Sequence, residues 1–491
     1  MPRRLLAGLA VFIVTAASVP ALTATAAAEP ARWTLPSKEF PLGEPTAARQ
    51  KHKAVAAGID LYTVRHGKKG DGYTVSLLMK GKDSGSRANA EAAAESARAA
   101  GFPAALTEFV RPGVADFPEG TGYMARVGLW PLDQRDKAAE MVKQLKEAGI
   151  SSKVDFLGDD GTQTTGPWDI RVLSVDPRVF RGSYHASLGK TVAARETTSS
   201  MAKQAGAIAA VNGGFFNIHT EKHLRGEPVG VSVVDGKLLS EAVAGRSALI
   251  LKDRTARITE IRTDVTVTSA DGEKTAITGV NRVAQPDELV LYTEEYGAKT
   301  PADDGAEAVL DAEGGVLELR ASGGKVEPGT RVLHGTGIMA DWIWSHAWEK
   351  WTVKVATKVI DLRTGKAIPL TPQTSVIGGG VGLVRNGRER VTAKADGQAS
   401  VNMILRRHPR TLAGVTRSGM LLLVTVDGRR PGSTVGASMV EAARLMVWLG
   451  ARQAINLDGG GSSAMIVKGK PVNRPSDGTE RGVGDALLIT P

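Results

Sequence analysis

The sequence predicts an α+β protein with two folded parts, a small N-terminal βαββαβ domain and a larger mixed domain built mainly on β-sheet. Residues 73–158 repeat a strand–helix–strand pattern. From Trp168 onward, many short apolar runs alternate with Asp-Gly and Asn-Gly turns, and helical patterns are few. The length of 491 residues also exceeds that of one ordinary domain.

The first 28 residues have the pattern of a secretory signal peptide. Two arginines precede the apolar stretch Leu5–Val19, and Ala26-Ala27-Ala28 precedes Glu29. This is the order of basic, apolar and cleavage regions in signal peptides. We expect cleavage before Glu29 and a secreted protein, with an uncleaved membrane anchor as the alternative. Since the chain contains no cysteine, core burial rather than disulfides must stabilise an exported protein.

The charge of the chain favours anionic partners without indicating nucleic acid. The formal net charge is +10, and lysine and arginine are spread along the chain rather than gathered in a basic block. A dedicated nucleic-acid arm would require such a block. A polyanionic cell wall or a phosphorylated substrate fits this distribution, and so does general solubility. After signal cleavage we expect no membrane span.

Each part of the N-terminal region follows from its local pattern. Residues 29–69 predict a linker or tether with one short strand near Leu61–Val64. Residues 70–158 then predict strand, helix, strand, strand, helix and strand, with Gly101 and Gly149 ending the helices as C′ residues do. A βαββαβ order is that of a ferredoxin-like sandwich, so we expect a separate domain here. The segment from Gly158 to Gly166 is the predicted boundary.

Short motifs in the same region resemble the SPOR repeat domain. The motifs are Tyr73–Leu77, Ala100-Gly101-Phe102, Ala125–Gly128 and Ala148-Gly149-Ile150. The resemblance implies that residues 70–158 bind peptidoglycan. The alternative is a βαββαβ unit that only packs against the next domain, because fold alone does not assign function.

Two strands of the larger part run directly into polar residues and glycines. Ala454–Leu457 is followed by Asp458, Gly459, Gly460, Gly461 and Ser462, and Ala209–Val211 is followed within six positions by Asn212, Gly213, Gly214, Phe215 and Asn217. Glycine allows the main chain to approach a ligand closely. Two such strand ends predict one shared pocket.

A helix predicted near Ala437–Leu449 contains only two charged residues, Glu441 and Arg444, which share a face. The rest of the helix is apolar, so it should be buried with Glu441 facing a site, and an exposed Glu441–Arg444 pair is the alternative. Paired carboxylates, here Glu441 and Asp458, divide acid, base or nucleophile roles in glycosidases. Upstream, His408 and Arg410 stand at a rigid turn, and arginine binds phosphate bidentately. Asp427 begins a predicted hairpin turn.

These motifs, in this order, resemble the phosphodiester glycosidases, the family of N-acetylglucosamine-1-phosphodiester α-N-acetylglucosaminidase. The resemblance covers residues 168–491 and includes Pro475-Ser476-Asp477. It implies an exported hydrolase that releases a sugar, such as α-N-acetylglucosamine, from a sugar-1-phosphodiester of wall or extracellular glycopolymers. The catalytic residues it implies are Asp458, Glu441 and Arg410. The substrate-binding residues it implies are Asn212, Gly213, Gly214, Phe215, Asn217, His408, Asp427, Gly459, Gly460, Gly461 and Ser462.

Several alternatives stay open at this point. The anomeric outcome depends on the separation of the carboxylates, which is about 5 Å for retention and larger for inversion. No cofactor is assigned, although Asp458, Asp427 and Asn217 carry the oxygen donors that a divalent cation prefers. A non-catalytic protein that binds wall glycan is the competing function. A phosphatase or nuclease would need histidine or metal-ligand clusters that the sequence lacks.

Overall fold

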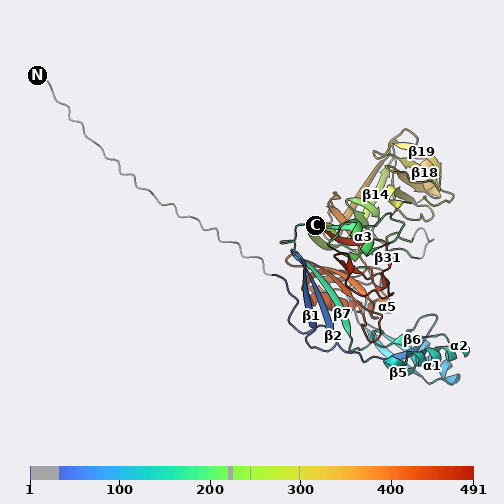
Figure 1. The fold of residues 1–491 in the computed structure, drawn as a ribbon. Coiled ribbons are helices and arrows are strands. Elements are labelled where there is room, and N and C mark those ends of the chain that lie inside the picture. The colour runs from blue at the N-terminus through green and yellow to red at the C-terminus, as the bar shows by residue number, and fades with distance from the viewer. Residues whose placement is uncertain (2–31, 219–224, 244, 298) are drawn as a thin grey trace. The chain divides into compact units, whose positions relative to one another are not determined.

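The computed structural model describes residues 1, 32–218, 225–243, 245–297 and 299–491 (Figure 1). Most of the predicted signal peptide, residues 2–28, therefore lies outside the described residues. The chain divides into the units Met1–Thr34 and Leu35–Pro491, and all elements described below belong to the second. Strands account for 41% of the residues and helices for 14%. The predicted α+β class is therefore wrong, because the protein is mostly β.

The central sheet contains strands from three distant parts of the unit Leu35–Pro491. Its strands, in order across the sheet, are β1 (Arg49–Ala56), β2 (Ile59–His66), β7 (Trp168–Val175), β27 (Leu421–Val426), β26 (Arg410–Thr416), β28 (Ala451–Asn456), β24 (Gly382–Arg385) and β25 (Arg388–Glu389). Every residue of β7 and β27 is buried, as expected for the middle of a sheet covered on both faces. Figure 1 shows β1 and β2 beside β7.

Residues 29–69 differ from the predicted tether, because two of the sheet's strands lie in this segment. β2 pairs with β7 over its whole length. β1 is the outermost strand, and seven of its eight residues are exposed. An edge strand with polar residues on both faces lacks the apolar alternation by which strands are found in sequences. That is why the sequence indicated only one short strand here.

Residues 73–156 contain the six elements that the sequence indicated. They are β3 (Tyr73–Leu77), α1 (Arg87–Ala99), β4 (Ala104–Arg111), β5 (Gly120–Trp130), α2 (Arg135–Glu147) and β6 (Ser152–Phe156), and the sheet order is β4-β5-β3-β6. The expected separate ferredoxin-like domain is not found, since these elements are part of the compact unit Leu35–Pro491. Asp155 of β6 binds Arg406, which is 251 residues further along the chain.

A second sheet packs on the central one. Its strands, in order, are β30 (Lys470–Pro471), β29 (Met465–Val467), β10 (Ala209–Asn212), β32 (Ala486–Thr490) and β8 (Ser183–Ser187). Their apolar residues share one core with those of β7, β27 and β28, for example Val211 with Leu423 and Ile455. Helix α3 (Thr198–Gln204) packs on β10. The short strand β9 (Glu196–Thr197) directly precedes α3 and pairs with β31 (Gly482–Val483).

A third sheet extends the same core. Its strands, in order, are β12 (Lys237–Ser240), β11 (Ser232–Val234), β23 (Thr374–Gly378), β13 (Ser247–Lys252), β14 (Thr255–Thr268), β21 (Lys354–Asp361) and β22 (Ala367–Ile368), with β15 (Lys274–Ala276) paired to β14. The remaining helices are α4 (Ile338–His346), α5 (Val401–Ile404) and α6 (Met439–Trp448), and the described 3₁₀ turns are η1 (Leu132–Gln134), η3 (Glu294–Tyr296) and η4 (Gly460–Ser462).

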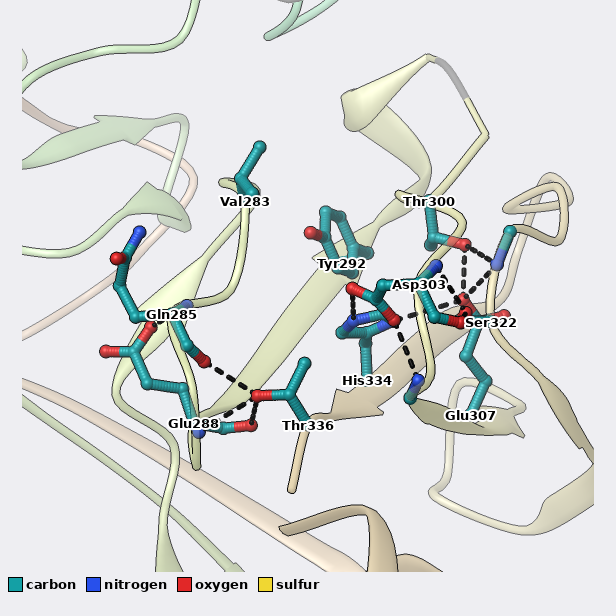
Figure 2. A network of polar contacts seen from close by, with 12 residues as sticks. Val283, Gln285, Glu288, Tyr292, Thr300, Asp303, Glu307, Ser322, His334 and Thr336 are labelled. Atoms are coloured by element: carbon teal, nitrogen blue, oxygen red, sulfur yellow. Dashed lines mark hydrogen bonds and ion pairs between the residues drawn. The ribbon is translucent and has the colours of Figure 1, made fainter. Parts of the chain in front are cut away.

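The fourth sheet carries a buried network of charged residues, which Figure 2 shows from close by. Its strands, in order, are β16 (Gly279–Val280), β17 (Leu289–Thr293), β20 (Arg331–Gly335), β18 (Ala306–Leu310) and β19 (Val316–Ala321). His334 is fully buried, with Nδ1 3.3 Å from Glu307 and Nε2 3.2 Å from Asp303. Arg320 also donates to Glu307. The network satisfies polar groups inside this sheet, away from the glycine-rich strand ends.

Candidate active site

The structure brings the two glycine-rich strand ends together. Asn212 ends β10, and its Nδ2 donates to the main-chain oxygen of Asp458 at 2.8 Å. Asp458 N in turn donates to the oxygen of Gly213 at 3.0 Å. Two loops that the sequence placed in one pocket are thus joined by direct hydrogen bonds.

The buried side chain of Asn212 lies at the centre of this contact between the two loops. Its Oδ1 accepts hydrogen bonds from Thr411 Oγ1 at 2.7 Å and from Ala464 N at 3.1 Å. Thr411 lies on β26 and Ala464 directly precedes β29, so three segments of the chain meet at one side chain. Asn212 is completely buried. The side chain therefore positions the Asp458 loop from the protein interior and does not itself reach a ligand.

Asp458 is half-buried at the start of this loop, with Oδ1 accepting from Gly459 N at 2.8 Å. Burial raises its pKa to about 6, although the hydrogen bond from Gly459 and the charges of Arg481 and Arg410 act in the opposite direction. A carboxyl with this pKa is mostly ionised at pH 7 and can change protonation near neutrality. Such shifted groups in a partly open site are typical of catalysis.

The glycine loop fits between charged side chains. A Cβ atom on Gly461 would lie only 2.1 Å from Nη2 of Arg481 and 2.2 Å from Oδ2 of Asp477. A Cβ atom on Gly460 would lie 3.2 Å from Nη1 of Arg429. Glycine at 461 is therefore a requirement of close packing. The loop backbone consequently lies against two guanidinium groups.

Asp485 is a site residue that the sequence reasoning missed. Its Oδ1 accepts from Gly214 N at 2.7 Å, and its main-chain oxygen accepts from Gly213 N at 2.9 Å. Burial and the neighbouring charge of Asp458 together raise its pKa to about 7. The signal was present, since Asp485 follows Gly-Val-Gly and precedes an apolar strand, which mirrors the pattern at Asp458.

A third glycine run, Gly378–Gly380 after β23, was also missed. Gly380 N donates to the oxygen of Asn456 at 2.8 Å, directly before the Asp458 loop. A Cβ atom on Gly380 would lie 2.5 Å from the ring of Phe215. Phe215 therefore packs over this run, and three glycine loops surround the site. The repeated Gly-Gly-Gly was the available signal.

Arg410 is a buried cation. Its Nε donates to Ala437 O at 2.9 Å, and its Nη2 donates to Met403 O at 3.2 Å. Burial lowers its pKa to about 9. Among the described residues, no carboxylate lies within ion-pair distance of Arg410. A buried positive charge without a paired anion is energetically costly, so this arrangement favours an anionic ligand nearby.

His408 is neutral and orients a further arginine. Burial, together with the charges of Arg410 and Arg429, lowers its pKa to about 3. Its Nε2 lies 2.9 Å from Asn402 Oδ1, and its Nδ1 lies 3.3 Å from Arg429 Nη2. A neutral ring that donates through Nε2 can accept from Arg429 through Nδ1. His408 therefore holds Arg429 beside Gly460.

Glu441 caps helix α6 and pairs with Arg407. It occupies the third position of α6 in a capping box, where its Oε2 accepts from Ser438 N at 2.9 Å. Arg407 binds the same carboxylate through two nitrogens, with Nη2 2.8 Å from Oε1. The alternative of an exposed Glu441–Arg444 pair does not form either, because Arg444 lies 3.8 Å from Glu389. Glu441 borders a separate cavity of about 400 Å³ with Trp168 and Thr164.

Asp427 contacts the segment that follows the glycine loop. It is buried, accepts from Arg474 N at 3.1 Å and lies 3.3 Å from Asn473 Nδ2. Asn473 also donates to Ser463 O at 3.0 Å. Burial raises the pKa of Asp427 to about 6. Asp427 thus supports the end of the glycine loop through Asn473.

The possible cation site of Asp458, Asp427 and Asn217 is not assembled by the described contacts. Both Asp427 oxygens already accept from Arg474 N. Asn217 N donates to Glu227 O at 2.8 Å, and the chain after Ile218 lies outside the described residues. Within the part of the chain that the structure describes, no group of three acidic or histidine side chains gathers as a metal site would.

Comparisons with known proteins extend these observations. Residues 304–490 match the phosphodiester glycosidase family model. A crystal structure of a candidate exported protein from Burkholderia pseudomallei is 30% identical, has a TM-score of 0.83 and covers 94% of this chain and 100% of its own. A hypothetical protein from Synechocystis shares the fold, at 16% identity, a TM-score of 0.57 and coverage of 90% and 76%.

Two further matches are more distant or shorter. The zebrafish N-acetylglucosamine-1-phosphodiester α-N-acetylglucosaminidase catalytic domain, auto-inhibited by its pro-peptide, is 16% identical with a TM-score of 0.34, over 79% of this chain and 83% of its own. An uncharacterized SPβ prophage-derived protein, YomE of Bacillus subtilis strain 168, is 40% identical over 111 residues, which are 23% of this chain and 16% of that protein.

Among the described residues, no helix has both the length and the hydropathy needed to cross a bilayer.

Asp458, Arg410 and Asp485 all lie within the matched range 304–490, whereas Asn212 precedes it. The chain therefore belongs to one family with the Burkholderia protein, and its residues 304–490 match the phosphodiester glycosidase family model.

Proposed function

We propose that this protein hydrolyses sugar-1-phosphodiesters, with Asp458 as the catalytic carboxylate. The observation that carries the proposal is the placement of Asp458. It is a half-buried carboxyl with a pKa of about 6, held in a glycine loop beside Arg429 and Arg481. A glycosidase needs a carboxylate at the anomeric carbon, and a phosphodiester needs cations at its phosphate.

The arginines supply the phosphate side of the site. Arg429 is exposed and is oriented by His408, while Arg481 is partly exposed and held by Asp477 with Nε 3.0 Å from Oδ2. Arg410 adds a positive charge from its buried position on β26. Guanidinium groups stabilise the negative charge that gathers on the phosphate as its bond to the sugar breaks.

In the reaction, the bond between the anomeric carbon and the phosphate oxygen breaks, and the electron pair leaves with the phosphate. Water supplies a hydroxyl group to the sugar, and its proton goes to the phosphate monoester or to solvent. Because a phosphate monoester is a good leaving group, the ionised Asp458 matters more than a strong acid. It stabilises the oxocarbenium-like transition state, as a nucleophile or as a base for water.

The sugar is an α-N-acetylglucosamine-like unit of an extracellular or wall glycopolymer. The signal-like N-terminus, the net charge of +10 and the similarity to a candidate exported protein support an extracellular site of action. Under this proposal residues 70–158 hold the enzyme on peptidoglycan. A sacculus pull-down with the intact protein tests that attachment.

The test is incubation of the purified protein with UDP-N-acetylglucosamine and other α-sugar-1-phosphodiesters, followed by an assay for free reducing sugar. We expect sugar and a phosphomonoester from the parent protein. The Asp458→Asn variant should lose at least about 100-fold in kcat. Asp136→Asn on the exposed face of α2 is the matched control and should keep full activity. Proton NMR of the first-formed anomer then separates retention from inversion.

Each other outcome of this assay points to a different function. Inorganic phosphate as the product would indicate a phosphatase. The absence of turnover across the panel, combined with binding to sacculi, would support the non-catalytic wall-binding protein. Equal activity of the parent and Asp458→Asn would remove Asp458 from the chemistry.

A further inference from the structure

The N-terminal strands of the central sheet form a pocket lined by cations. It has a volume of about 470 Å³ and lies where β1 begins and β2 ends. Four cationic side chains line it, together with the single carboxylate of Glu44; the cations are Arg49, Arg65, Lys68 and Lys69. We call this the cationic pocket.

The strand register concentrates the charge in this pocket. Arg49 and Arg65 are directly paired across β1 and β2, so their side chains leave the same face of the sheet. Like charges directly opposite each other destabilise a strand pair. Asp169 on β7 offsets only part of this repulsion, because it lies 3.2 Å from Arg65 Nε but also binds Arg171.

The other cations of the pocket lack acidic partners. Among the described residues, no carboxylate lies within ion-pair distance of Arg49, Lys68 or Lys69. The backbone that carries the lysines is nevertheless fixed, because Lys68 N donates to Thr165 O at 2.9 Å and Thr165 Oγ1 donates to Lys68 O at 3.1 Å. The backbone at Lys68 is therefore held beside the pocket.

Protection of an edge strand explains only part of this pattern. Lysines on an outermost strand prevent pairing with another chain, which accounts for Lys51 and Lys53 on β1. It does not account for two arginines placed face to face, or for Lys68 and Lys69, which follow β2. A concave surface with unbalanced positive charge fits an anionic ligand.

We propose that the cationic pocket binds a phosphate-bearing polyanionic chain, separately from the Asp458 site. Arginine forks and lysine ammonium groups both bind phosphate oxygens. The choice of phosphate rather than carboxylate rests on the proposed function, whose substrates carry phosphodiesters. The pocket would hold the polymer while another part of it is cleaved.

The test uses inorganic polyphosphate as the probe and measures its equilibrium binding to the purified full chain by calorimetry. The pocket variant is Lys68→Glu/Lys69→Glu. The matched control is Lys137→Glu/Lys146→Glu on α2, which makes the same change of net charge at two exposed positions. We expect about tenfold weaker binding for the pocket variant and a change below about twofold for the control.

The outcomes are distinguishable. If both variants bind polyphosphate equally weakly, the binding comes from the overall charge of the protein. If the parent protein does not bind polyphosphate, the pocket is not a binding site. Either result overturns the proposal. Tighter binding of polygalacturonate than of polyphosphate at equal charge would overturn the phosphate class. The binding measurement requires no turnover, so it tests the cationic pocket independently of the proposed function. A protein that binds polyphosphate but is inactive would support the pocket alone. A protein that is active but does not bind polyphosphate would support the proposed function alone.

Discussion

The side-chain amide of Asn212 donates a 2.8 Å hydrogen bond to the main-chain oxygen of Asp458, across 246 residues of sequence. The same side chain accepts from Thr411 and from Ala464 N. One buried amide thus fixes the position of the half-buried carboxyl that we propose is catalytic. Small displacements of such a group lower catalytic rates strongly.

We therefore expect Asn212→Ala to lower both activity and stability. The change leaves a buried hydroxyl and a buried N–H without acceptors, which costs about 2–4 kcal/mol. The Asp458 loop also loses its anchor, so kcat should fall by at least about tenfold. Urea unfolding and steady-state kinetics measure the two effects.

Thr411→Val is the matched control for this change. It removes only the hydroxyl donor to Asn212 and leaves the bond from Asn212 to Asp458. We expect a loss of about 1 kcal/mol and a nearly unchanged kcat. Equal losses of kcat in both variants would contradict the anchoring role of the Asn212 bond.

Asp485 makes stability depend on pH. Its pKa is raised to about 7 in the folded protein by burial and by Asp458, whereas an unfolded aspartate has a pKa of about 3.9. Between these values the unfolded chain has lost the proton and the folded chain keeps it. The contribution of Asp485 to the free energy of unfolding therefore falls as pH rises, by up to about 1.4 kcal/mol per pH unit, until pH 7.

Asp485→Asn should remove this contribution. Asparagine keeps an oxygen for Gly214 N and carries no titrating proton. Chemical unfolding between pH 4.5 and pH 7 should show a less negative slope of stability against pH in the variant. Asp136→Asn, which is exposed, should reproduce the slope of the parent protein. Identical slopes in all three proteins would place the pKa of Asp485 near its ordinary value.

The parts of the site that could be predicted are those where glycine is needed for the backbone to pack closely. Glycines after apolar strands indicated the loops at Asn212 and Asp458, and the structure joins them. The same pattern at Gly378–Gly380 and before Asp485 could have been used in the same way. Edge strand β1 was not predictable by this route, because an exposed edge strand needs no apolar periodicity.

The role of Glu441 shows a second limit of sequence reasoning. A charged residue on an apolar helix indicates a partner, and the partner here is Arg407, one residue before His408. Which carboxylate faces the pocket and which one caps a helix depends on contacts between distant segments. Ser438 three residues before Glu441 was the available sign of a capping box.

Glu441→Gln provides a direct test of the two roles. Glutamine still accepts from Ser438 N but loses the charge that pairs with buried Arg407. We expect a loss of about 1–3 kcal/mol in stability and a kcat within about twofold of the parent. A fall in kcat of about 100-fold with unchanged stability would instead make Glu441 a catalytic carboxylate.

Asp155 on β6 should position the site although it lies far from Arg410 in sequence. Arg406 donates to Asp155 Oδ1 at 3.0 Å and to Oδ2 at 2.8 Å. Burial alone would raise the pKa of Asp155, but the hydrogen bonds and charge of Arg406 outweigh it and hold the pKa below its usual value. The segment from Arg406 to Arg410 is thereby fastened to residues 73–156.

We expect Asp155→Asn to cost about 3–5 kcal/mol, because it leaves Arg406 buried without its main anion. Displacement of the adjoining His408 and Arg410 should raise KM for a phosphodiester more than it lowers kcat. Asp83→Asn, which removes a single contact to Arg406 at 2.7 Å, should give a smaller change in the same direction. Unchanged KM in both variants, despite lower stability, would confine the role of Asp155 to folding and separate residues 73–156 from the proposed catalysis.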